Sequence, residues 1–417
     1  MKIAIVGTGI AGMTAARMLN RRNSITVFES AGYIGGHTNT IEVADGARTL
    51  SVDTGFIVFN ELNYPNLCRL FRELGVESRD SDMSFSVHCE KSGVEYNGTS
   101  VDLLFAQRRN LLRPRFWGML AEILRFNREA PRELADGLDD TVSVASYIGQ
   151  RGYSKVFVDH YLVPLGASLW SCDARRFHHF PMRFVIEFLH NHGMLRVNGR
   201  PTWKTVIGGS SRYVAPLVAP FRDRILLNTS VTAVRRCRGG VEVVVDGGHR
   251  ERFDEVVLAC HADQSRRLVL DMDAEEREIL DHFPYQVNEA VLHTDTRLLP
   301  IRRRAWGSWN YRIPAEQRDR VTVTYNMNML QGLESARTYC VSLNQTESID
   351  PAAVIRRIRY EHPLFVPGRD EAQVNHGALI RRRGISYCGA YWGYGFHEDG
   401  VRSALSVCDA FDVSLAA

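Results

Sequence analysis

Three glycines near the start of the chain have the spacing that a nucleotide phosphate requires. They directly follow the apolar run 2–6, and a helical pattern at 13–19 comes next. Gly7 allows a tight turn, Gly9 lets the backbone approach a pyrophosphate, and Gly12 lets a helix pack closely on a strand. The helix would direct its free N–H groups at the phosphates. The predicted contact residues of this dinucleotide site are Gly7, Gly9, Ile10, Ala11 and Gly12.

An acidic residue completes the nucleotide pattern. A second apolar segment, 24–28, ends at Glu29. This residue lies about 20 positions beyond the glycines, where a carboxylate commonly binds the ribose hydroxyls of a dinucleotide. The order strand, glycine turn, helix, strand and acid is therefore present, and a glycine-rich turn beside an exposed glutamate is the alternative. We predict that Glu29 and the adjacent Ser30 contact the nucleotide.

Two further motifs distinguish FAD from NAD, whose sites share this fingerprint. They are the segments 35–38 (GGHT) and 53–56 (DTGF). Together they resemble the extended FAD signature of the flavin amine oxidase and phytoene desaturase superfamily. That superfamily usually has arginine at the position of His37, so a structural histidine is the alternative to a phosphate contact there. The contacts with FAD that the resemblance implies are those of Gly35, Gly36, His37, Thr38, Thr54, Gly55 and Phe56.

The C-terminal segment contains a second glycine turn that opens a helix. An apolar strand at 385–389 precedes a segment rich in glycine and aromatic residues, 390–400, and a helical pattern follows at 401–411. The start of a helix presents unpaired N–H groups and a positive dipole end. In the superfamily that this chain resembles, the terminal helix points at the pyrimidine edge of the flavin. The cofactor contacts that the resemblance implies here are those of Gly389, Ala390, Asp399, Gly400 and Val401.

The segments between these motifs predict further elements. Segment 101–192 has apolar residues at helical spacing. Segment 203–213 breaks that pattern and resembles the superfamily's return into the FAD-binding domain. The resemblance places Val231 at the adenine, with a plain sheet residue as the alternative. Strand patterns occur at 225–234, 241–245, 253–259, 321–327 and 338–343.

The expected fold class is α/β, with a doubly wound, Rossmann-like FAD-binding domain interleaved with an α+β substrate-binding domain. The length of 417 residues exceeds that of one ordinary domain. Residues 1–90, 200–283 and 375–417 are assigned to the FAD-binding domain, and residues 91–199 and 284–374 to the substrate domain. The chain therefore crosses between the two domains more than once.

Aromatic residues near the C-terminus are the candidates for contact with the flavin ring. The residues that the resemblance places nearest the ring are Tyr391, Trp392, Tyr394, Phe396 and His397. Aromatic walls hold elongated apolar substrates, and packing of the strand–helix turn is the alternative. Many amine oxidases of the superfamily hold a water at the flavin with a lysine, and Lys204 is the one lysine that we consider for that role. The chain has only four lysines, which argues against amines.

A closer resemblance suggests the substrate class. Segments 53–60, 63–67, 203–213 and 325–328 resemble a bacterial group usually called predicted NAD/FAD-binding proteins. That group often accompanies enzymes that modify unsaturated fatty acyl chains by methyl transfer or cyclopropanation. The resemblance implies an FAD-dependent oxidoreductase that transfers a hydride from a fatty-acyl or other lipid chain to flavin N5, as a desaturase or dehydrogenase does. The alternatives are a flavin amine oxidase that releases hydrogen peroxide, and a non-catalytic flavin-binding partner of a lipid methyltransferase.

One basic and apolar segment suits contact with a lipid surface. Arg108, Arg109, Arg113 and Arg115 stand among leucines, a phenylalanine and Trp117. Such segments lie at membrane interfaces and attract anionic headgroups. A solvated helix face beside a core stripe has the same composition. Peripheral contact with the inner membrane face is therefore a hypothesis that the sequence raises.

Composition excludes several other classes of protein. With 45% hydrophobic and 24% charged residues and a net charge of +3, the chain is globular and lacks the basic excess of a nucleic-acid binder. The eight cysteines include no C-x-x-C pair, so no zinc site is expected from them. His178, His179, His190 and His192 have no other ligand at a familiar spacing, so we expect them to have a structural or pocket-lining role and to bind no metal. No apolar run is long enough to span a membrane. The first strand begins at Lys2, which predicts a cytoplasmic protein without a signal peptide.

Overall fold

Segments from both ends of the chain share one parallel sheet. The computed structural model describes residues 1–315 and 321–415. Five parallel strands lie in the order β10 (Ile225–Leu226), β2 (Ser24–Phe28), β1 (Lys2–Val6), β14 (Glu255–Leu258) and β20 (Ile385–Tyr387). β1 is almost wholly apolar because both faces of the sheet are covered. The predicted doubly wound arrangement is confirmed.

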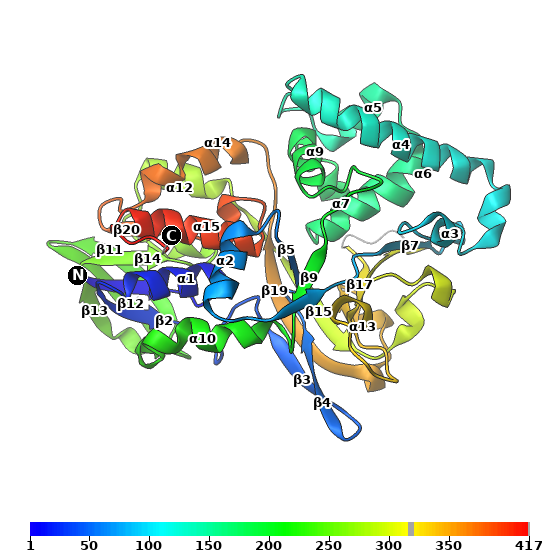
Figure 1. Cartoon of the computed structure of the whole chain (residues 1–417). Helices are drawn as coiled ribbons and strands as arrows, with labels where there is room; N and C mark the ends of the chain where they lie inside the picture. Colours follow the sequence, from blue (N-terminus) through cyan, green and yellow to red (C-terminus); the bar gives the residue numbers. More distant parts are fainter. Residues whose placement is uncertain (316–320, 416–417) are drawn as a thin grey trace.

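Two layers cover the parallel sheet. On one face α1 (Ile10–Leu19) packs against α15 (His397–Asp409), as Figure 1 shows. Ile3 and Ile5 of β1 point to this face, and Ala4 and Val6 point to the other, because side chains alternate along a strand. The elements packed with the second face are β11 (Val231–Cys237), β12 (Gly240–Val245), β13 (Arg250–Phe253), α11 (Ala262–Leu268) and α12 (Ala274–Asp281).

A seven-stranded sheet forms the second domain. Its order is β19 (Val354–Pro363), β15 (Tyr285–His293), β18 (Cys340–Leu343), β17 (Val323–Asn326), β16 (Trp309–Ile313), β7 (Phe85–Cys89) and β8 (Val94–Asn97). β7 pairs in parallel with β16. The chain therefore enters this sheet before the predicted domain boundary at residue 90. A short strand has the same alternating pattern in either sheet, so only its pairing assigns it to a domain.

Helices from segment 101–191 lie beside this sheet (Figure 1). The elements are α3 (Val101–Leu104), the 3₁₀ helix η1 (Arg108–Leu112), α4 (Pro114–Ala135), α5 (Val144–Arg151), α6 (Lys155–Phe157), α7 (Val163–Leu169), α8 (Ala174–Phe177) and α9 (Met182–Asn191). In α4, Pro114 occupies the first turn, where a missing N–H costs nothing. Phe116, Met119 and Phe126 recur at helical spacing and are buried. Within residues 1–315 and 321–415, no helix has the length and apolarity needed to cross a bilayer.

One buried carboxylate joins the domains. Asp53 accepts hydrogen bonds from the Ser210 N–H and from the Gln331 side-chain amide, both at 2.9 Å. Burial raises the pKa of Asp53 to about 6. The elements around this junction are the hairpin β3 (Thr40–Asp45) and β4 (Arg48–Asp53), and the small sheet β5 (Val58–Asn60), β9 (Trp203–Val206) and β6 (Ser78–Asp80). The remaining α-helices are α2 (Pro65–Glu73), α10 (Val214–Val218), α13 (Met327–Gln331) and α14 (Arg369–Val374).

Two predicted elements differ from those observed. The strand expected over 225–234 is two strands, because Asn228 adopts a left-handed conformation (φ 50°) between β10 and β11. The terminal helix begins at His397 instead of residue 401. Its first turn is stabilised by the Asp399 carboxylate, which accepts the Phe396 N–H at 3.0 Å.

Candidate functional site

A large cavity begins at the carboxyl end of β1 and extends to α4. Its volume is about 1620 Å³, and its wall includes the glycine turn, the C-terminal aromatic segment and helices of the second domain. Ligands of doubly wound folds bind at the carboxyl ends of the strands. Because single small-molecule pockets usually measure roughly 300–1,000 Å³, this cavity has room for a dinucleotide and a second ligand.

The glycine turn forms the first part of the wall. A Cβ atom at Gly9 would stand in open space, so the backbone is free to meet a pyrophosphate there. Gly12 lies behind the wall, where a Cβ would overlap the carbonyl oxygen of Gly7 and push α1 away from β1. Ile10 and Ala11 line the cavity. As first residues of α1 they present N–H groups that have no intrahelical partners, which suits an anion.

Glu29 is held at the edge of the cavity by the backbone around it. Its carboxylate accepts hydrogen bonds from the N–H groups of Thr8 at 2.9 Å and Ala31 at 2.8 Å. These bonds orient a carboxylate that lines the cavity, as a ribose contact requires. Ser30 and Val231 lie on the same wall. The adenine contact of Val231 stays a prediction.

The GGHT loop lies against the glycine turn. The Cβ position of Gly36 is 3.2 Å from Gly9 Cα, so both glycine segments flank one space. The His37 ring stacks on Tyr360 with centroids 4.8 Å apart and lies 5.4 Å from His362. Burial and the neighbouring histidines hold the pKa of His37 well below its usual value, so the ring is neutral and does not supply an arginine's charge. Its buried Nε2 has no hydrogen-bond partner within the described residues, which leaves it able to bond a cofactor atom.

The DTGF segment supports the GGHT loop. Thr54 donates to the Asn39 carbonyl at 2.8 Å, and its hydroxyl lies 2.9 Å from that of Tyr360. A Cβ atom at Gly55 would overlap the His37 carbonyl, so glycine permits this contact. The cavity wall here consists of Gly35, Gly36, His37, Thr54, Gly55 and Phe56. Thr38 lies behind the wall.

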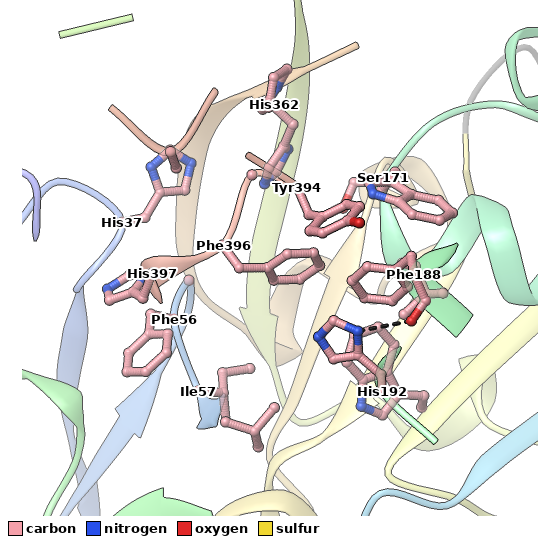
Figure 2. A pocket seen from close by; sticks show the side chains of 18 of the residues that line it. His37, Phe56, Ile57, Ser171, Phe188, His192, His362, Tyr394, Phe396 and His397 are labelled. Carbon is pink, nitrogen blue, oxygen red and sulfur yellow. Dashed lines mark hydrogen bonds between the residues drawn. The ribbon is translucent and has the colours of Figure 1, made fainter. Parts of the chain in front are cut away.

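His397 joins the two ends of the chain at the cavity (Figure 2). Its ring stacks on Phe56 with centroids 3.6 Å apart. Its Nε2 lies 3.1 Å from both Thr38 Oγ1 and the Tyr213 hydroxyl. Burial lowers the pKa of His397 to about 3, so the ring is neutral at ordinary pH. Thr38 thus positions a residue of the wall without belonging to it.

A group of aromatic side chains runs from His397 to the end of α9 in the second domain (Figure 2). The name aromatic group is used for Phe56, Phe188, His192, Tyr394, Phe396 and His397. Phe188 stacks on Phe396 at 5.2 Å and on His192 at 3.8 Å. Burial lowers the pKa of His192 to about 4 and raises that of Tyr394 to about 12, so both are neutral. Neutral stacked rings make a wall that suits a flat or apolar ligand.

Beyond the aromatic group the cavity continues as an apolar space, termed the outer chamber. It lies between α3, α4 and the seven-stranded sheet. Its lining residues include Tyr96, Leu104, Phe105, Leu120, Ile123, Leu124, Tyr161, Leu169, Trp170, Met194, Trp309, Tyr325 and Leu343. Of the described residues on this part of the wall, Asp82 and Arg200 carry charge, and both are solvent-exposed. The interior of the chamber is therefore neutral.

Two residues that were considered for the flavin ring lie elsewhere. Lys204 is on β9, and its ammonium group contacts the exposed Glu61 carboxylate at 2.5 Å. It does not line the cavity, so the role considered for it at the flavin is corrected to that of a surface ion pair. Trp392 packs on Phe283 with ring centroids 5.1 Å apart, and it also lies off the wall. The alternation of side chains along β9 directs Lys204 away from the cavity, and the turn before α15 does the same for Trp392.

After His397, which lines the cavity, the first turn of α15 packs on α1 or turns back on its own start. A Cβ atom at Gly400 would come within 2.8 Å of the Ile10 side chain, so glycine allows the two helices to pack closely. Asp399 turns back to the Phe396 N–H and pairs with Arg402 at 2.9 Å. Burial raises the pKa of Asp399 to about 6. Asp399, Gly400 and Val401 therefore lie off the wall, which is formed here by Gly389, Ala390, Tyr391, Tyr394, Gly395, Phe396 and His397.

Phe188, Tyr360 and His362 escaped sequence reasoning, whereas His192 was expected to have a structural or pocket-lining role. Phe188 and His192 are four positions apart at the end of α9, and Tyr360 and His362 are two apart on β19. Each spacing puts its pair on one face of its element. Spacing alone does not tell which face of α9 or β19 meets the cavity, so these pairs could not be assigned to the site from the sequence.

These features fit FAD. The open backbone at Gly9 and the start of α1 suit a pyrophosphate, and the fixed carboxylate of Glu29 suits a ribose. The unpartnered Nε2 of His37 and the neutral aromatic group suit a flat heterocycle. The donor set therefore matches a flavin dinucleotide along the wall.

Comparisons of sequence agree with this site. The family model described as flavin containing amine oxidoreductase matches residues 10–311. Zeta-carotene desaturases of Solanum lycopersicum and Capsicum annuum are each 35% identical to this chain over 78 residues. That match covers 18% of this chain and only 13% of the length of each desaturase.

Similar solved structures cover the whole fold. Cyclohexylamine oxidase from Brevibacterium oxydans has a TM-score of 0.70 at 15% identity, with 99% of both chains covered. A fatty acid isomerase from P. acnes that produces CLA has a TM-score of 0.68 at 15% identity, with 99% of this chain and 98% of the isomerase covered. At such identities the likeness establishes the fold.

Proposed function

This chain belongs to the family of flavin-containing amine oxidoreductases, and we propose that its substrate is a long apolar chain, such as a fatty-acyl or other lipid chain. The protein is an FAD-dependent oxidoreductase. Bound FAD supplies the acceptor for a hydride and its electron pair. In the proposed reaction the hydride leaves one carbon and a proton leaves its neighbour for solvent, which leaves a double bond. Oxygen or a quinone then takes up the two electrons.

The observation that carries the proposal is the outer chamber. The aromatic group opens onto a space lined by leucines, isoleucine, methionine and aromatic rings, and the exposed Asp82 and Arg200 are the charged residues of its described wall. Burying apolar area is favourable at roughly 25 cal/mol per Å², whereas an unpaired charge there would be strongly penalised. A long hydrocarbon chain matches such a space better than a small polar amine does.

The residues near the ring position the substrate and do not act as strong bases. Burial keeps His397 and His192 neutral, with pKa values lowered to about 3 and about 4. Phe396 and Phe188 stack on each other, with ring centroids 5.2 Å apart, and add apolar surface beside them. The chain therefore favours removal of hydride from a carbon that is already activated, for example beside a double bond.

The printed names of two similar proteins support this substrate class. One is a zeta-carotene desaturase, and the other is a fatty acid isomerase that produces CLA. Both names refer to long apolar molecules. A partnership with a lipid methyltransferase stays a prediction, and family membership favours an enzyme over a non-catalytic flavin carrier.

The test is anaerobic reduction of the FAD-loaded protein, followed at the flavin absorbance near 450 nm, about where oxidised flavin absorbs. Detergent-dispersed phospholipids and fatty acids of increasing chain length should bleach the band. Leu120→Trp fills the outer chamber and should slow long substrates much more than short ones. Arg128→Trp, on an exposed part of the same helix, is the matched control and should leave both unchanged.

Two outcomes would overturn the proposal. Bleaching by simple amines with release of hydrogen peroxide, and none by lipids, would favour the amine oxidase alternative. If Leu120→Trp and Arg128→Trp change the rate of flavin reduction by long substrates equally, the outer chamber does not bind the substrate.

A further inference from the structure

Exposed apolar side chains stand at the rim of the cavity. Val101, Trp117, Leu124 and Val197 line it, and they are 73%, 49%, 59% and 67% exposed. Exposed large apolar residues elsewhere on the described surface do not line the cavity. Burying apolar surface is favourable by roughly 25 cal/mol per Å², and these exposed side chains do not gain that free energy. The apolar rim therefore comes from α3, α4 and the segment between α9 and β9.

The same apolar surface continues outside the rim. On η1, Leu112 is 87% exposed and does not line the cavity. The Trp117 Nε1 donates to the Leu111 carbonyl at 3.0 Å, and the Trp117 ring lies 5.1 Å from that of Phe105. These contacts hold α3, η1 and the start of α4 together as one surface. The exposed residues Val101, Leu111, Leu112, Trp117 and Leu124 are termed the apolar ridge.

Arginines accompany the apolar ridge. Arg108 pairs with Asp102 at 2.8 Å, and Arg304 pairs with the same carboxylate, so two positive charges share one negative charge. Arg109 and Arg113 donate to backbone or amide oxygens, which leaves their positive charges in place. The surface around the ridge is therefore net positive and suits an anionic partner.

We propose that the apolar ridge docks on an anionic lipid bilayer, so that the cavity opens into hydrocarbon. The leucines and Trp117 would enter the acyl boundary while the arginines meet lipid phosphates. Figure 1 shows α3 and the start of α4 at the end of the molecule away from α1, which keeps the FAD-binding sheet clear of the membrane. Docking is independent of the reaction. The consequence, passage of an acyl chain into the outer chamber without crossing water, rests on the proposed function.

The test is co-sedimentation of the FAD-loaded protein with vesicles of phosphatidylcholine, with and without phosphatidylglycerol. Binding should require phosphatidylglycerol. Leu112→Asp should weaken it by roughly 10- to 100-fold, the value of burying one leucine. Arg108→Gln combined with Arg109→Gln should weaken it by about 30-fold, since each basic residue near the surface contributes about fivefold.

Matched controls lie on other surfaces. Val374→Asp changes a residue that is 84% exposed at the end of α14, and it should leave vesicle binding unchanged. Arg356→Gln combined with Arg357→Gln removes two exposed charges from β19 and should do the same. Absence of binding by the parent protein, or equal losses in the ridge and control variants, would overturn docking. If the protein forms a dimer without vesicles, and Leu112→Asp abolishes that dimer, the apolar ridge is an interface between two copies of the chain and not a membrane-docking surface.

Flavin reduction separates this inference from the proposed function. Because Leu112 lies off the cavity wall, Leu112→Asp should oxidise a detergent-dispersed acyl substrate at the parent rate. The same variant should be slower when the substrate is embedded in anionic vesicles. Vesicle binding without flavin reduction by any lipid would refute the proposed reaction and leave docking intact. Equal rates in vesicles would refute delivery through the ridge.

Discussion

Replacement of Gly9 by alanine separates cofactor binding from folding. Gly9 has φ −62° and ψ 175°, which alanine adopts without strain, and its Cβ position stands in open space. The added methyl group would therefore meet no protein atom. It would occupy the space in which the glycine turn and the start of α1 meet a pyrophosphate.

The expected magnitudes follow from this geometry. The flavin-free protein should be unchanged, or more stable by about 0.4–1 kcal/mol because alanine restricts the unfolded chain. Loss of one charge-assisted hydrogen bond from a helix N–H to a phosphate costs about 1.5–3 kcal/mol, which is roughly a 10- to 150-fold rise in Kd for FAD. Gly12→Ala is the contrasting variant. Its methyl would overlap the Gly7 carbonyl, so overpacking should destabilise the flavin-free protein itself by about 1–3 kcal/mol.

Two measurements on the same variants check this reasoning. Urea unfolding of the flavin-free proteins gives the stability change, and quenching of flavin fluorescence gives the Kd for FAD. Gly9→Ala should alter the second quantity and spare the first, whereas Gly12→Ala should alter both. If Gly9→Ala folds normally and binds FAD as tightly as the parent, the pyrophosphate does not lie at this turn.

Two further predictions concern acid stability and the surface lysine. Burial lowers the pKa of His397 to about 3 and those of His192 and His362 to about 4, so the unfolded chain takes up protons below pH 6.5 that the folded state refuses. Each histidine therefore contributes to the free energy of unfolding above about pH 6.5. That contribution is lost on acidification, and the loss reaches about 2 kcal/mol at pH 5. In urea unfolding, His397→Phe should shrink the difference between pH 7 and pH 5 by that amount, and an unchanged difference would contradict the neutral buried ring. Lys204→Met removes only an ion pair with exposed Glu61, so anaerobic flavin reduction should keep its rate; a large loss would restore lysine chemistry at the flavin.

The nucleotide end of the cavity could be predicted from local sequence patterns. Gly9, Gly12 and Glu29 lie within one strand–helix–strand unit, where short-range sterics and chain direction decide the geometry. Gly9 leaves open space for a phosphate, and Gly12 avoids a clash between a methyl group and the Gly7 carbonyl. Both requirements arise within a few residues of chain. For that reason the turn, the first helix and the acid appear where their spacing predicted them.

Local signals were less decisive at the C-terminal turn. The aromatic and glycine pattern located the segment, and Phe396 and His397 do line the cavity. Its spacing did not reveal that Gly400 serves the contact between α15 and α1, or that Asp399 turns back to its own helix start. The role of Gly400 depends on α1, a helix almost 400 residues away along the chain, whereas the Asp399 contact is a local cap of α15.

The substrate end of the cavity depends on contacts between elements that are far apart in the sequence. Phe188 and His192 come from α9, and Tyr360 and His362 from β19, and each pair meets the GGHT loop or the C-terminal turn across long sequence separations. Lys204 shows the converse, because its place on β9 turns it to the surface and to Glu61. The face that a helix or strand presents to a cavity is set by which other elements pack against it. Those long-range contacts leave no fixed spacing in the sequence. The sequence indicated the basic and apolar segment around Trp117, but the outer chamber that it borders emerged only from the folded chain.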